Sequence, residues 1–387
     1  MRRADAESLA SVDADPRLIS AQTPLIDVRA PVEFAQGALP GAVNLPLMND
    51  DERHQVGIAY KAQGQAAAIA LGERLVSGAV KAARVNAWRD YVAQHPDAVI
   101  YCFRGGLRSQ IAQAWLAEAG VTRPRIDGGW KALRQALTAR IDTAAEQPML
   151  IIGGLTGCAK TVLINRLESG VDLEGFARHK GSAFGRMPEP PPSQIDFEHT
   201  LAKRLLTLSG PLVVEDESRQ VGSVNVPLAF WHAMEKAPRM RIEMPLDWRL
   251  AQLIQDYIID LERAYAQRLG PGEGWQRMQT QLENSLLRLK KRLGDARLQR
   301  LQRMQALAFA AHERGDRQAH EAWLAPLLTE YYDPLYRYHL KRQQEAGAIE
   351  LHVGDWESVL AAAQQWQAEH AAGVAERSRS GMAQPLA

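Results

Sequence analysis

Short apolar runs alternate with longer amphipathic segments through the first part of the chain. The runs that predict strands are residues 25–28, 42–46 and 98–101. A long helical stretch lies between the second and third runs, rich in Ala and Gln and then amphipathic through Trp88 and Tyr91, and residues 107–119 also have helical spacing. Strands that alternate with helices predict a mainly parallel sheet with helices on its faces.

The same alternation resumes near residue 147 and then gives way to helices. Buried strands are predicted at residues 149–152, 212–217 and 239–244. A helix begins at Thr161, and the Pro-rich residues 187–193 predict an ordered loop or a lid. From about residue 246 the pattern is helical, and residues 285–305 predict one helix with a leucine stripe that packs on the second unit.

These patterns predict an α/β protein with two parallel-sheet domains and a helical C-terminal part. The expected division is a flexible N-terminus at 1–14, a first domain at 15–138, a second domain at 145–245, a helical region at 246–370 and a disordered tail at 371–387. The helical region is expected to pack on the second domain and to contact nucleic acid.

Composition narrows the cellular setting. The 387 residues carry a formal net charge of +1, so any nucleic-acid surface must be a local patch. Two cysteines, Cys102 and Cys158, argue against a disulfide scaffold and favour a reducing compartment. No apolar stretch follows Met1 as in a signal peptide, and no run is long enough to span a bilayer, so we expect a cytoplasmic protein without membrane contact.

Cys102 lies where a strand ends and a Gly-bearing turn leads into a helix. Backbone N–H groups and the helix dipole at such a position favour the thiolate, which is the nucleophile. Arg104 and Arg108 add positive charge nearby, and such a cradle can hold a persulfide or its selenium analogue as an anion. The alternative is a buried structural cysteine, against which the flanking Arg and Gly residues argue.

A second loop nearly matches the P-loop pattern G-x-x-x-x-G-K-[ST], with Ala159 at the last Gly position. Lys160 can reach a terminal phosphate, and Thr161 is a candidate Mg²⁺ ligand. The candidate diphosphate-binding residues are Gly154, Thr156, Gly157, Cys158, Ala159, Lys160 and Thr161. The extra methyl of Ala159 is expected close to the phosphate, where it would weaken nucleotide binding, so ATP is not assured.

Two further predictions concern side chains around this loop. Cys158 stands at a helix start, which would lower its pKa, although a role as a small packing residue is favoured. Asp216 and Glu217 end a buried strand, where a metal-binding or water-positioning carboxylate is expected. The alternative for this pair is a solvated strand end.

The thiol loop, residues 101–109, resembles the active-site loop of the rhodanese family. Residues 27–34 and 37–46 are similar to the two N-terminal signatures of that family, in order and at normal spacing. The resemblance implies that Cys102 carries sulfur or selenium and that Asp27 and Arg29 hold the fold together. The His often found in the second signature is Ala38 here, and we take that position as structural.

Further segments extend the resemblance to nearly the whole chain, from about residue 15 to about residue 365. They are residues 49–57, 60–61, 67–72, 127–134, 179–185, 214–219 and 331–336. Together and in this order they resemble the bacterial tRNA 2-selenouridine synthase family, in which a rhodanese-like domain is fused to a P-loop domain.

The resemblance implies a two-step reaction on 2-thiouridine at the wobble position, position 34, of tRNA. The family first alkylates the sulfur with geranyl diphosphate and then replaces the geranylthio group with selenium from selenophosphate. The P-loop would hold the diphosphate through Lys160. Cys102, with Arg104 and Arg108, would carry selenium as a selenyl-cysteine. The implied tRNAs are those for Lys, Glu and Gln, a selenophosphate supply enzyme is a candidate partner, and we expect a monomer without a covalently bound cofactor.

Candidate tRNA contacts are the cationic side chains near the P-loop and on the predicted basic helix. They are Lys180, Arg186, Arg288, Lys291 and Arg292. The alternatives are a solvated helix face and, for Lys180, contact with the phosphates of the donor. Tyrosines at positions 331, 332, 336 and 338 could stack on a base, although core packing is favoured for most of them.

Two other functions compete with this reading. One is a sulfurtransferase fused to a small-molecule kinase or NTPase, which would need no RNA; the basic helix and the incomplete P-loop pattern count against it. The other is a tRNA-binding, redox-sensing NTPase module in which Cys102 is a switch. The segments that match across the chain favour the synthase.

Overall fold

The computed structural model describes residues 9–381, with side chains described up to residue 371. It divides into two compact units. The first unit runs to Thr143 and also includes residues 193–207, whereas the second comprises residues 144–192 and the chain from Leu208 onward. Residues 193–207, which the sequence places within the second domain, therefore belong to the first unit.

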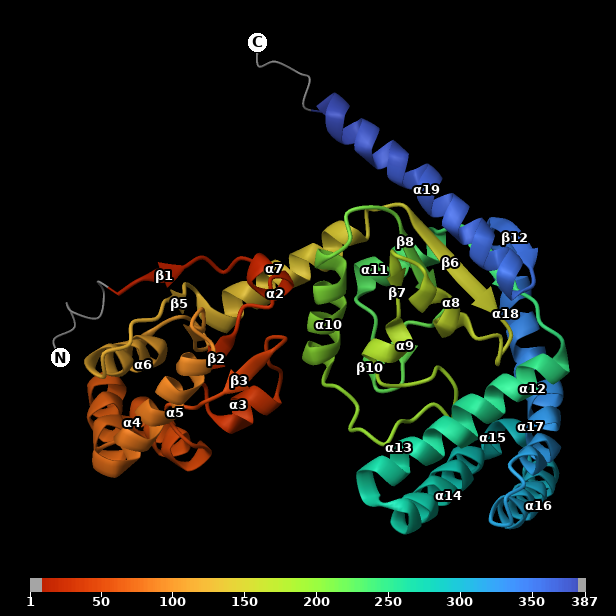
Figure 1. The fold of residues 1–387 in the computed structure, drawn as a ribbon, viewed down its shortest axis with the longest axis horizontal. Helices are drawn as coiled ribbons and strands as arrows, with labels where there is room; N and C mark the ends of the chain where they lie inside the picture. Colours follow the sequence, from red (N-terminus) through yellow and green to blue (C-terminus); the bar gives the residue numbers. More distant parts are fainter. Residues whose placement is uncertain (1–8, 382–387) are drawn as a thin grey trace. The chain divides into compact units, whose positions relative to one another are not determined.

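The first unit is built on a five-stranded parallel sheet, which confirms the predicted fold class (Figure 1). The strand order is β1 (Ser11–Val12), β5 (Arg125–Ile126), β4 (Val99–Tyr101), β2 (Leu25–Asp27) and β3 (Ala42–Asn44). Residues 1–14 were expected to be flexible. Within that segment, however, β1 is an ordered strand, because it pairs with β5. Residues 1–8 of that segment lie outside the described residues.

Helices flank this sheet, and the long helical stretch after β3 consists of two of them. The helices are α2 (Arg17–Ser20), α3 (Pro31–Ala35), α4 (Asp50–Leu75), α5 (Gly78–Gln94), α6 (Leu107–Glu118), α7 (Gly129–Ala144) and α10 (Gln194–Leu206). α4 is interrupted at Gly64, which has a φ of 83°. Trp88 of α5 and Leu116 of α6 pack with Ile26 and Ile100 of the sheet in one buried cluster.

The glycine at position 37 shows why α10 packs on the first unit. A Cβ at Gly37 would lie 2.3 Å from Ile195 of α10, so only glycine permits this contact. The backbone carbonyl of Ala38 is 2.6 Å from His199 Nδ1, and the N–H of Ala38 donates to Asp196 at 3.1 Å. Burial lowers the pKa of His199 to about 4, so its ring is neutral at pH 7. The segment that carries the second rhodanese signature is therefore a docking surface for α10.

The second unit contains another five-stranded parallel sheet. Its order is β12 (Glu350–Gly354), β11 (Arg239–Ile242), β6 (Met149–Gly154), β8 (Leu212–Glu215) and β7 (Gly170–Val171). A small antiparallel pair, β9 (Gln220–Val221) and β10 (Val224–Asn225), stands apart from it. β12 corrects the prediction that the chain beyond residue 246 is helical, because this strand completes the sheet beside β11.

Helices of the second unit cover this sheet. They are α8 (Lys160–Arg166), α9 (Leu173–Phe176), α11 (Leu228–Lys236) and α19 (Trp356–Gly381). α8 and α19 bury apolar side chains in one cluster with β6, β8 and β11. The tail expected to be disordered from residue 371 continues α19 to Gly381, and residues 382–387 lie outside the described part of the chain.

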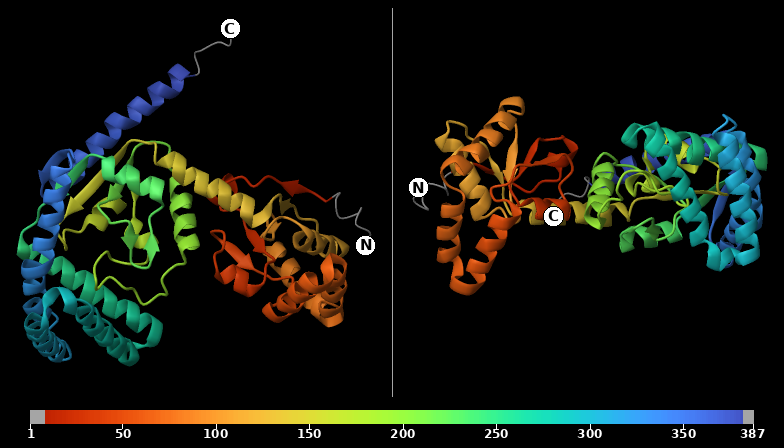
Figure 2. Two further views of the ribbon diagram at one scale, coloured as in Figure 1. Left: turned by 180° about the vertical axis from the view of Figure 1, so that it is seen from behind. Right: turned by 90° about the horizontal axis from the view of Figure 1, so that it is seen from below.

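The remaining helices gather at one end of the second unit (Figures 1 and 2). They are α12 (Leu246–Ile254), α13 (Asp260–Leu269), α14 (Pro271–Arg288), α15 (Lys290–Leu293), α16 (Asp295–His312), α17 (Glu321–Leu327) and α18 (Asp333–Glu345). Short π-helical turns at Gln255–Ile259 and Leu328–Tyr332 and a 3₁₀ turn at Gln318–His320 join some of them. In the described part of the chain, none of the helices is both long and apolar enough to cross a membrane.

The single helix predicted at residues 285–305 is wrong. The chain forms the end of α14, the short α15 and the start of α16, and the break before α16 is at Gly294, whose φ is 75°. The leucine stripe is nevertheless a buried core, since all five leucines belong to one apolar cluster; they are Leu286, Leu289, Leu293, Leu298 and Leu301.

Two candidate active sites

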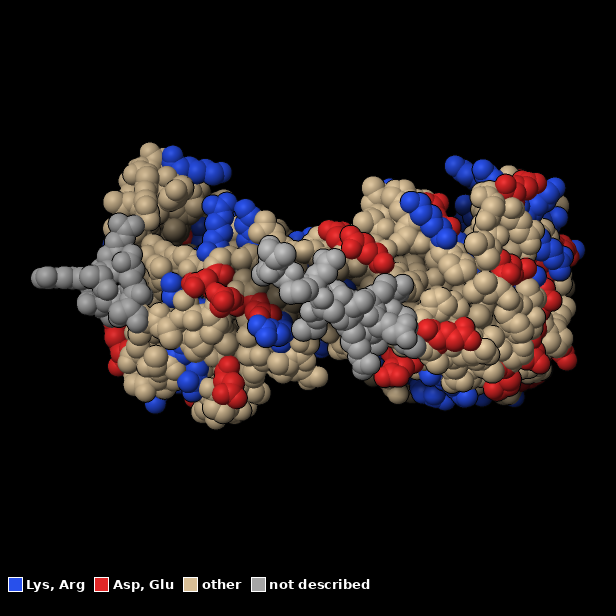
Figure 3. All heavy atoms as spheres, turned by 90° about the horizontal axis from the view of Figure 1, so that it is seen from above, with Lys and Arg blue, Asp and Glu red and all other residues tan. Residues whose placement is uncertain are grey.

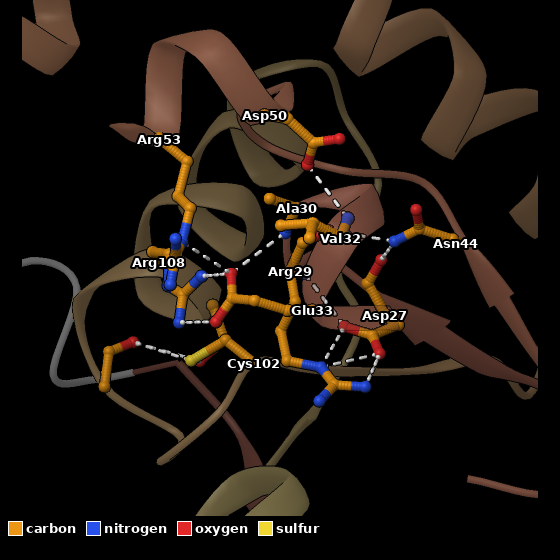
Figure 4. A network of polar contacts seen from close by, with 12 residues as sticks. Asp27, Arg29, Ala30, Val32, Glu33, Asn44, Asp50, Arg53, Cys102 and Arg108 are labelled. Atoms are coloured by element: carbon orange, nitrogen blue, oxygen red, sulfur yellow. Dashed lines mark hydrogen bonds and ion pairs between the residues drawn. The ribbon is translucent and has the colours of Figure 1, made fainter. Parts of the chain in front are cut away.

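Cys102 follows β4 and is almost fully buried, at 3% exposure. Its Sγ–H donates to Ser109 Oγ at 3.2 Å, and the Ser109 hydroxyl donates to the carbonyl of Gly106 at 3.0 Å (Figure 4). Ser109 is thus a polar partner of the thiol that the sequence did not single out. Its place as the last residue of the rhodanese-like loop was the available signal.

The charge around the thiol differs from the expectation for Arg108. Its guanidinium donates to both carboxylate oxygens of Glu33, at 2.6 and 3.2 Å, and Arg53 lies 3.6 Å from the same carboxylate (Figure 4). Burial alone would raise the pKa of Glu33, but the hydrogen bonds from Arg108 outweigh it and the pKa is lowered. Glu33 therefore offsets the cationic charge of Arg108, whereas Arg104 is exposed and lies 5.8 Å from the Phe103 ring.

Asp27 and Arg29 form a buried ion pair at 2.6 Å, as expected of residues that hold the fold together (Figure 4). Arg29 also donates to the carbonyl of Gly37 at 3.0 Å and lies 5.0 Å from the Trp130 ring. Their side chains are therefore fully used in structural contacts.

The start of α7 supports the thiol loop from behind. The N–H of Trp130 donates to the carbonyl of Cys102 at 2.9 Å, and the N–H of Lys131 donates to that of Phe103 at 3.0 Å. Gly105 and Gly129 both have positive φ and pack against each other, since a Cβ at Gly129 would lie 2.3 Å from the Cys102 carbonyl and 2.4 Å from the Gly105 nitrogen. This contact explains the requirement for glycine at position 129. In the sequence, the only sign of it was the match of residues 127–134 to the family.

We expect Gly129→Ala to displace the thiol loop and to lower the stability of the first unit by about 2 kcal/mol or more, because a left-handed φ of 58° and a clash with the backbone act together. Thermal unfolding of the variant measures this loss. Gly120→Ala is the matched control, since Gly120 has a φ of 82° but nothing within 4 Å of its would-be Cβ. Equal losses in the two variants would show that the close packing at Gly129 carries no weight.

In the second unit, the P-loop joins β6 to α8, at the carboxyl ends of the strands. Lys160 Nζ donates to the carbonyl of Gly154 at 3.1 Å, and the hydroxyl of Thr161 donates to Glu174 at 3.1 Å. Burial alone would lower the pKa of Lys160, but the nearby carboxyl groups of Glu174 and Glu217 outweigh it and the pKa is raised. Lys160 is therefore a charged ammonium in the loop.

A buried ion pair fixes the other side of the loop. Arg249 of α12 pairs with Asp333 of α18 at 2.8 Å and also donates to the carbonyl of Thr156 at 3.2 Å. The loop approaches α12 so closely that a Cβ at Gly157, whose φ is 86°, would lie 2.8 Å from the carbonyl of Arg249. Helices from the C-terminal part thus position the P-loop backbone.

The structure corrects one prediction about the loop and shows the surroundings of Ala159. Burial raises the pKa of Cys158, so the expected lowering at a helix start is wrong, and the small-residue role stands. Ala159 keeps the left-handed conformation of the glycine it replaces, with a φ of 51°. Its methyl packs against the apolar cluster that contains Trp356, and the Trp356 indole donates to the Ala159 carbonyl at 3.2 Å. Ala159 is only partly buried and also lines the cavity at the P-loop, so its effect on a bound phosphate stays a prediction.

Three glutamates lie near Lys160 and Thr161; Glu215 is buried, whereas Glu174 and Glu217 are half-buried. Glu215 is completely buried and accepts from the N–H of Glu174 at 3.1 Å, while its Oε1 has no partner. Burial, reinforced by Glu174, raises the pKa of Glu215 to about 8 and that of Glu217 well above its ordinary value. The carboxyls of Glu174 and Glu217 hydrogen-bond each other, so they share a proton. Asp216 instead pairs with Arg239 at 2.5 Å.

The raised pKa of Glu215 predicts a pH effect on stability. Below pH 4.5 the group is protonated in both states and costs nothing; above it the unfolded state ionises while the folded state keeps its proton until about pH 8. Stability should therefore fall between these values, by on the order of 5 kcal/mol from this group. In urea unfolding, Glu215→Gln should gain stability relative to the unchanged protein at pH 8 but not at pH 5. A difference independent of pH would contradict the assignment.

The structure adds no further ligands to the Mg²⁺ site predicted at Thr161. Among residues 9–371, no group of three or more His, Cys, Asp or Glu side chains is arranged to hold a metal ion. The Thr161 hydroxyl is hydrogen-bonded to Glu174, and the carboxyls behind it hold protons. Mg²⁺ at Thr161 therefore stays a prediction.

The P-loop faces a cavity of about 1140 Å³ within the second unit. The P-loop with Lys160 and Thr161 forms part of the lining, as do Met187, Glu189 and Pro190 of the Pro-rich loop. Helices of the C-terminal part contribute apolar and aromatic side chains, namely Leu253, Tyr257, Leu289, Tyr331, Tyr332 and Leu335, together with the polar Asp256, Arg268, Arg292 and His339. Three of the four tyrosines considered for base stacking (331, 332 and 336) line this cavity, whereas Tyr338 is 57% exposed.

The candidate tRNA contacts are largely engaged within the second unit. Lys180 pairs with Asp256 at 2.5 Å, and Arg288 donates to the carbonyl of Ala183 at 2.8 Å. Arg292 donates to the Tyr331 hydroxyl at 3.0 Å. The backbone carbonyl of Arg186 accepts from Gln281, and Lys291 is exposed. On the face shown in Figure 3, basic and acidic side chains are interspersed. Lys180 and Arg292 line the cavity, so they can act on a ligand there.

Comparison with known proteins covers both units. The family model for the tRNA 2-selenouridine synthase AAA domain matches residues 147–370, and the rhodanese-like domain matches residues 11–136. A tRNA 2-selenouridine synthase of Chromohalobacter salexigens is 63% identical over 91% of this chain and 97% of its own length. Those of Photobacterium profundum and Bordetella bronchiseptica are each 47% identical, over 84% and 89% of this chain and 90% and 94% of their own lengths. With a thiol loop on one parallel sheet and a P-loop on another, the chain belongs to the tRNA 2-selenouridine synthase family.

Proposed function

We propose that this protein converts 2-thiouridine at the wobble position of tRNA to 2-selenouridine, first by S-geranylation and then by selenation. The first step belongs to the P-loop cavity. The sulfur on C2 of the base attacks C1 of geranyl diphosphate, the bond from C1 to the diphosphate oxygen breaks, and N3 of the base loses its proton. Diphosphate leaves with the electron pair of the broken bond.

The observation that carries this proposal is the P-loop cavity of the second unit. A P-loop with the charged Lys160 suits a diphosphate, since backbone N–H groups and an ammonium stabilise the charge that develops on the leaving group. The apolar and aromatic side chains of the helical lining offer contact to a prenyl chain, which the polar sugar of a nucleoside triphosphate would not use. This favours a prenyl diphosphate as the ligand of the P-loop.

The second step belongs to the thiol loop of the first unit. C2 of the base gains a bond to selenium and loses its bond to sulfur, and geranylthiol leaves. Water cleaves the phosphorus–selenium bond of selenophosphate to phosphate, so selenium keeps its oxidation state and no external oxidant or reductant is consumed. Cys102 is proposed to hold the selenium at the selenide level, with Arg104 exposed beside it. A covalent selenyl-cysteine would need a two-electron oxidant and is not part of this step.

Incubation of the purified protein with 2-thiouridine tRNA, geranyl diphosphate and selenophosphate tests the function. We expect nucleoside mass analysis to detect S-geranyl-2-thiouridine without selenophosphate and 2-selenouridine with it. Absence of both nucleosides would refute the proposal. Formation of 2-selenouridine without geranyl diphosphate would refute the two-step order.

The proposal also covers the tRNA acceptors, a partner enzyme, the oligomeric state and the cellular location. It includes the tRNAs for Lys, Glu and Gln as acceptors, a selenophosphate supply enzyme as a partner, a monomeric protein and a location in the cytoplasm, where these tRNAs are found. What supports it is the family membership of the chain.

A further inference from the structure

The thiol of Cys102 faces a cavity of about 700 Å³ in the first unit. This volume lies within the range of small-molecule sites, about 300–1,000 Å³. Its walls come from both arms of the interrupted helix α4, from α6 and from the residues just before α4. Most of the side chains that line it are apolar, among them Leu47, Met48, Val56, Ile58, Ile69 and Ile111.

This lining does not match a selenium donor alone. Selenophosphate, selenide and phosphate are small anions, which N–H groups and guanidinium groups recognise. Contact with apolar side chains would not increase the affinity for such anions. Nevertheless, Ile58 and Leu107 line the cavity, and their exposed fractions are 55% and 39%. Exposed apolar side chains gathered beside a reactive group indicate a ligand with an apolar part.

We propose that this cavity binds the alkyl chain of the S-alkylated base while C2 of that base meets Cys102. The inference rests on the proposed function, in which the base reaches the second step carrying a geranyl group and loses it as geranylthiol. Arg104 and Lys61 also line the cavity and are exposed, so they can meet the phosphates of the RNA that carries the base. The cavity thus offers a place for each part of one ligand: apolar chain, reacting carbon and polyanion.

Burial of the chain gives the thiol loop a basis for selecting its substrate. Each buried methylene changes affinity by about fourfold. A base with a ten-carbon chain is therefore held far more tightly than unmodified 2-thiouridine. Selenation then acts on the product of the first step in preference to its starting material.

The test compares two nucleosides, S-geranyl-2-thiouridine and S-methyl-2-thiouridine, for binding to the full chain by calorimetry. We expect the geranyl compound to bind at least roughly tenfold more tightly. Ile58→Ser should weaken geranyl binding about tenfold by removing apolar contact, and leave methyl binding unchanged. Gly57→Phe should do the same by filling the cavity, since Gly57 lines it and has nothing within 4 Å of its would-be Cβ.

Val80→Ser is the matched control. Val80 is 39% exposed in α5 and does not line the cavity, so its replacement should change neither affinity. The geranyl nucleoside should also slow alkylation of Cys102 by iodoacetamide, read at the peptide level, whereas the methyl nucleoside should not.

Equal affinities for the two nucleosides, or a geranyl preference that survives both Ile58→Ser and Gly57→Phe, would overturn the inference. Because the binding measurement needs no turnover, it separates this inference from the proposed function, whose failure would appear as absence of modified nucleosides in the tRNA assay.

Discussion

Replacement of Cys102 by Ser should abolish 2-selenouridine formation, by at least roughly 10³-fold, and leave S-geranylation unchanged. The serine hydroxyl can keep the contact with Ser109 Oγ, now 3.2 Å from Sγ, so the loop should stay folded. A hydroxyl at this position is not ionised at neutral pH and has little affinity for selenium. The variant should therefore accumulate S-geranyl-2-thiouridine in tRNA, measured by nucleoside mass analysis.

Cys158→Ser is the matched control for this experiment, since Cys158 is the other cysteine of the chain and is also buried. It packs in the core beneath the P-loop, so its replacement should disturb geranylation or stability before it disturbs selenation. Retained 2-selenouridine formation by the Cys102 variant would eliminate Cys102 as the group that holds selenium.

Replacement of Lys160 by Ala should lower geranylation by roughly 10²–10³-fold, because it removes a charged donor aimed at the diphosphate that leaves. Burial raises the pKa of Glu174 and that of Glu217, and Lys160 opposes this rise, so without it both carboxyls should bind protons more readily and the variant should fold. Selenation of tRNA that already carries S-geranyl-2-thiouridine should continue at the original rate. Single-turnover assays of the two steps, each started from its own substrate, measure this separation.

Lys341→Ala is the control for general loss of charge, since Lys341 in α18 is 75% exposed and pairs only loosely with Glu345, at 3.8 Å. It should change neither rate. If Lys160→Ala leaves geranylation intact while abolishing an ATP-dependent step, the P-loop is a nucleotide site and the prenyl diphosphate assignment is wrong.

Local sequence patterns predicted the features that depend on neighbouring residues, namely the buried strands and the buried side of the helices. The strand before Cys102 and the strand before the P-loop are continuous apolar runs, as parallel strands buried on both faces require. The leucine stripe of residues 286–301 predicted the buried core correctly even though the helix breaks there. Leucine spacing reports burial, whereas the break depends on Gly294, whose left-handed φ interrupts a pattern that otherwise reads as one helix.

What the sequence could not predict depends on contacts between distant segments. The ion pair between Arg108 and Glu33 joins residues 75 positions apart, so the charge at the thiol could not be judged from the loop alone. The backbone of Ala159 is bound by α19, nearly 200 positions later, whose Trp356 donates to the Ala159 carbonyl. α10 packs on the first unit although the residues on both sides of it in the sequence belong to the second unit. This packing depends on Gly37, where any larger side chain would clash with Ile195 of α10.

The path of α10 also determines how the chain can be divided. The chain passes between the two units three times, after Thr143, after Pro192 and after Thr207. A fragment that ends at residue 143 lacks α10, with its buried Phe197 and Leu201, and so uncovers Gly37 and the carbonyl of Ala38. Neither unit is therefore a detachable module, and a gene split at the apparent domain boundary should yield two unstable halves. Recombination or fusion must therefore keep the chain whole across all three crossings, because a cut after residue 207 would separate β6 and β7 from β8, β11 and β12 of the same sheet.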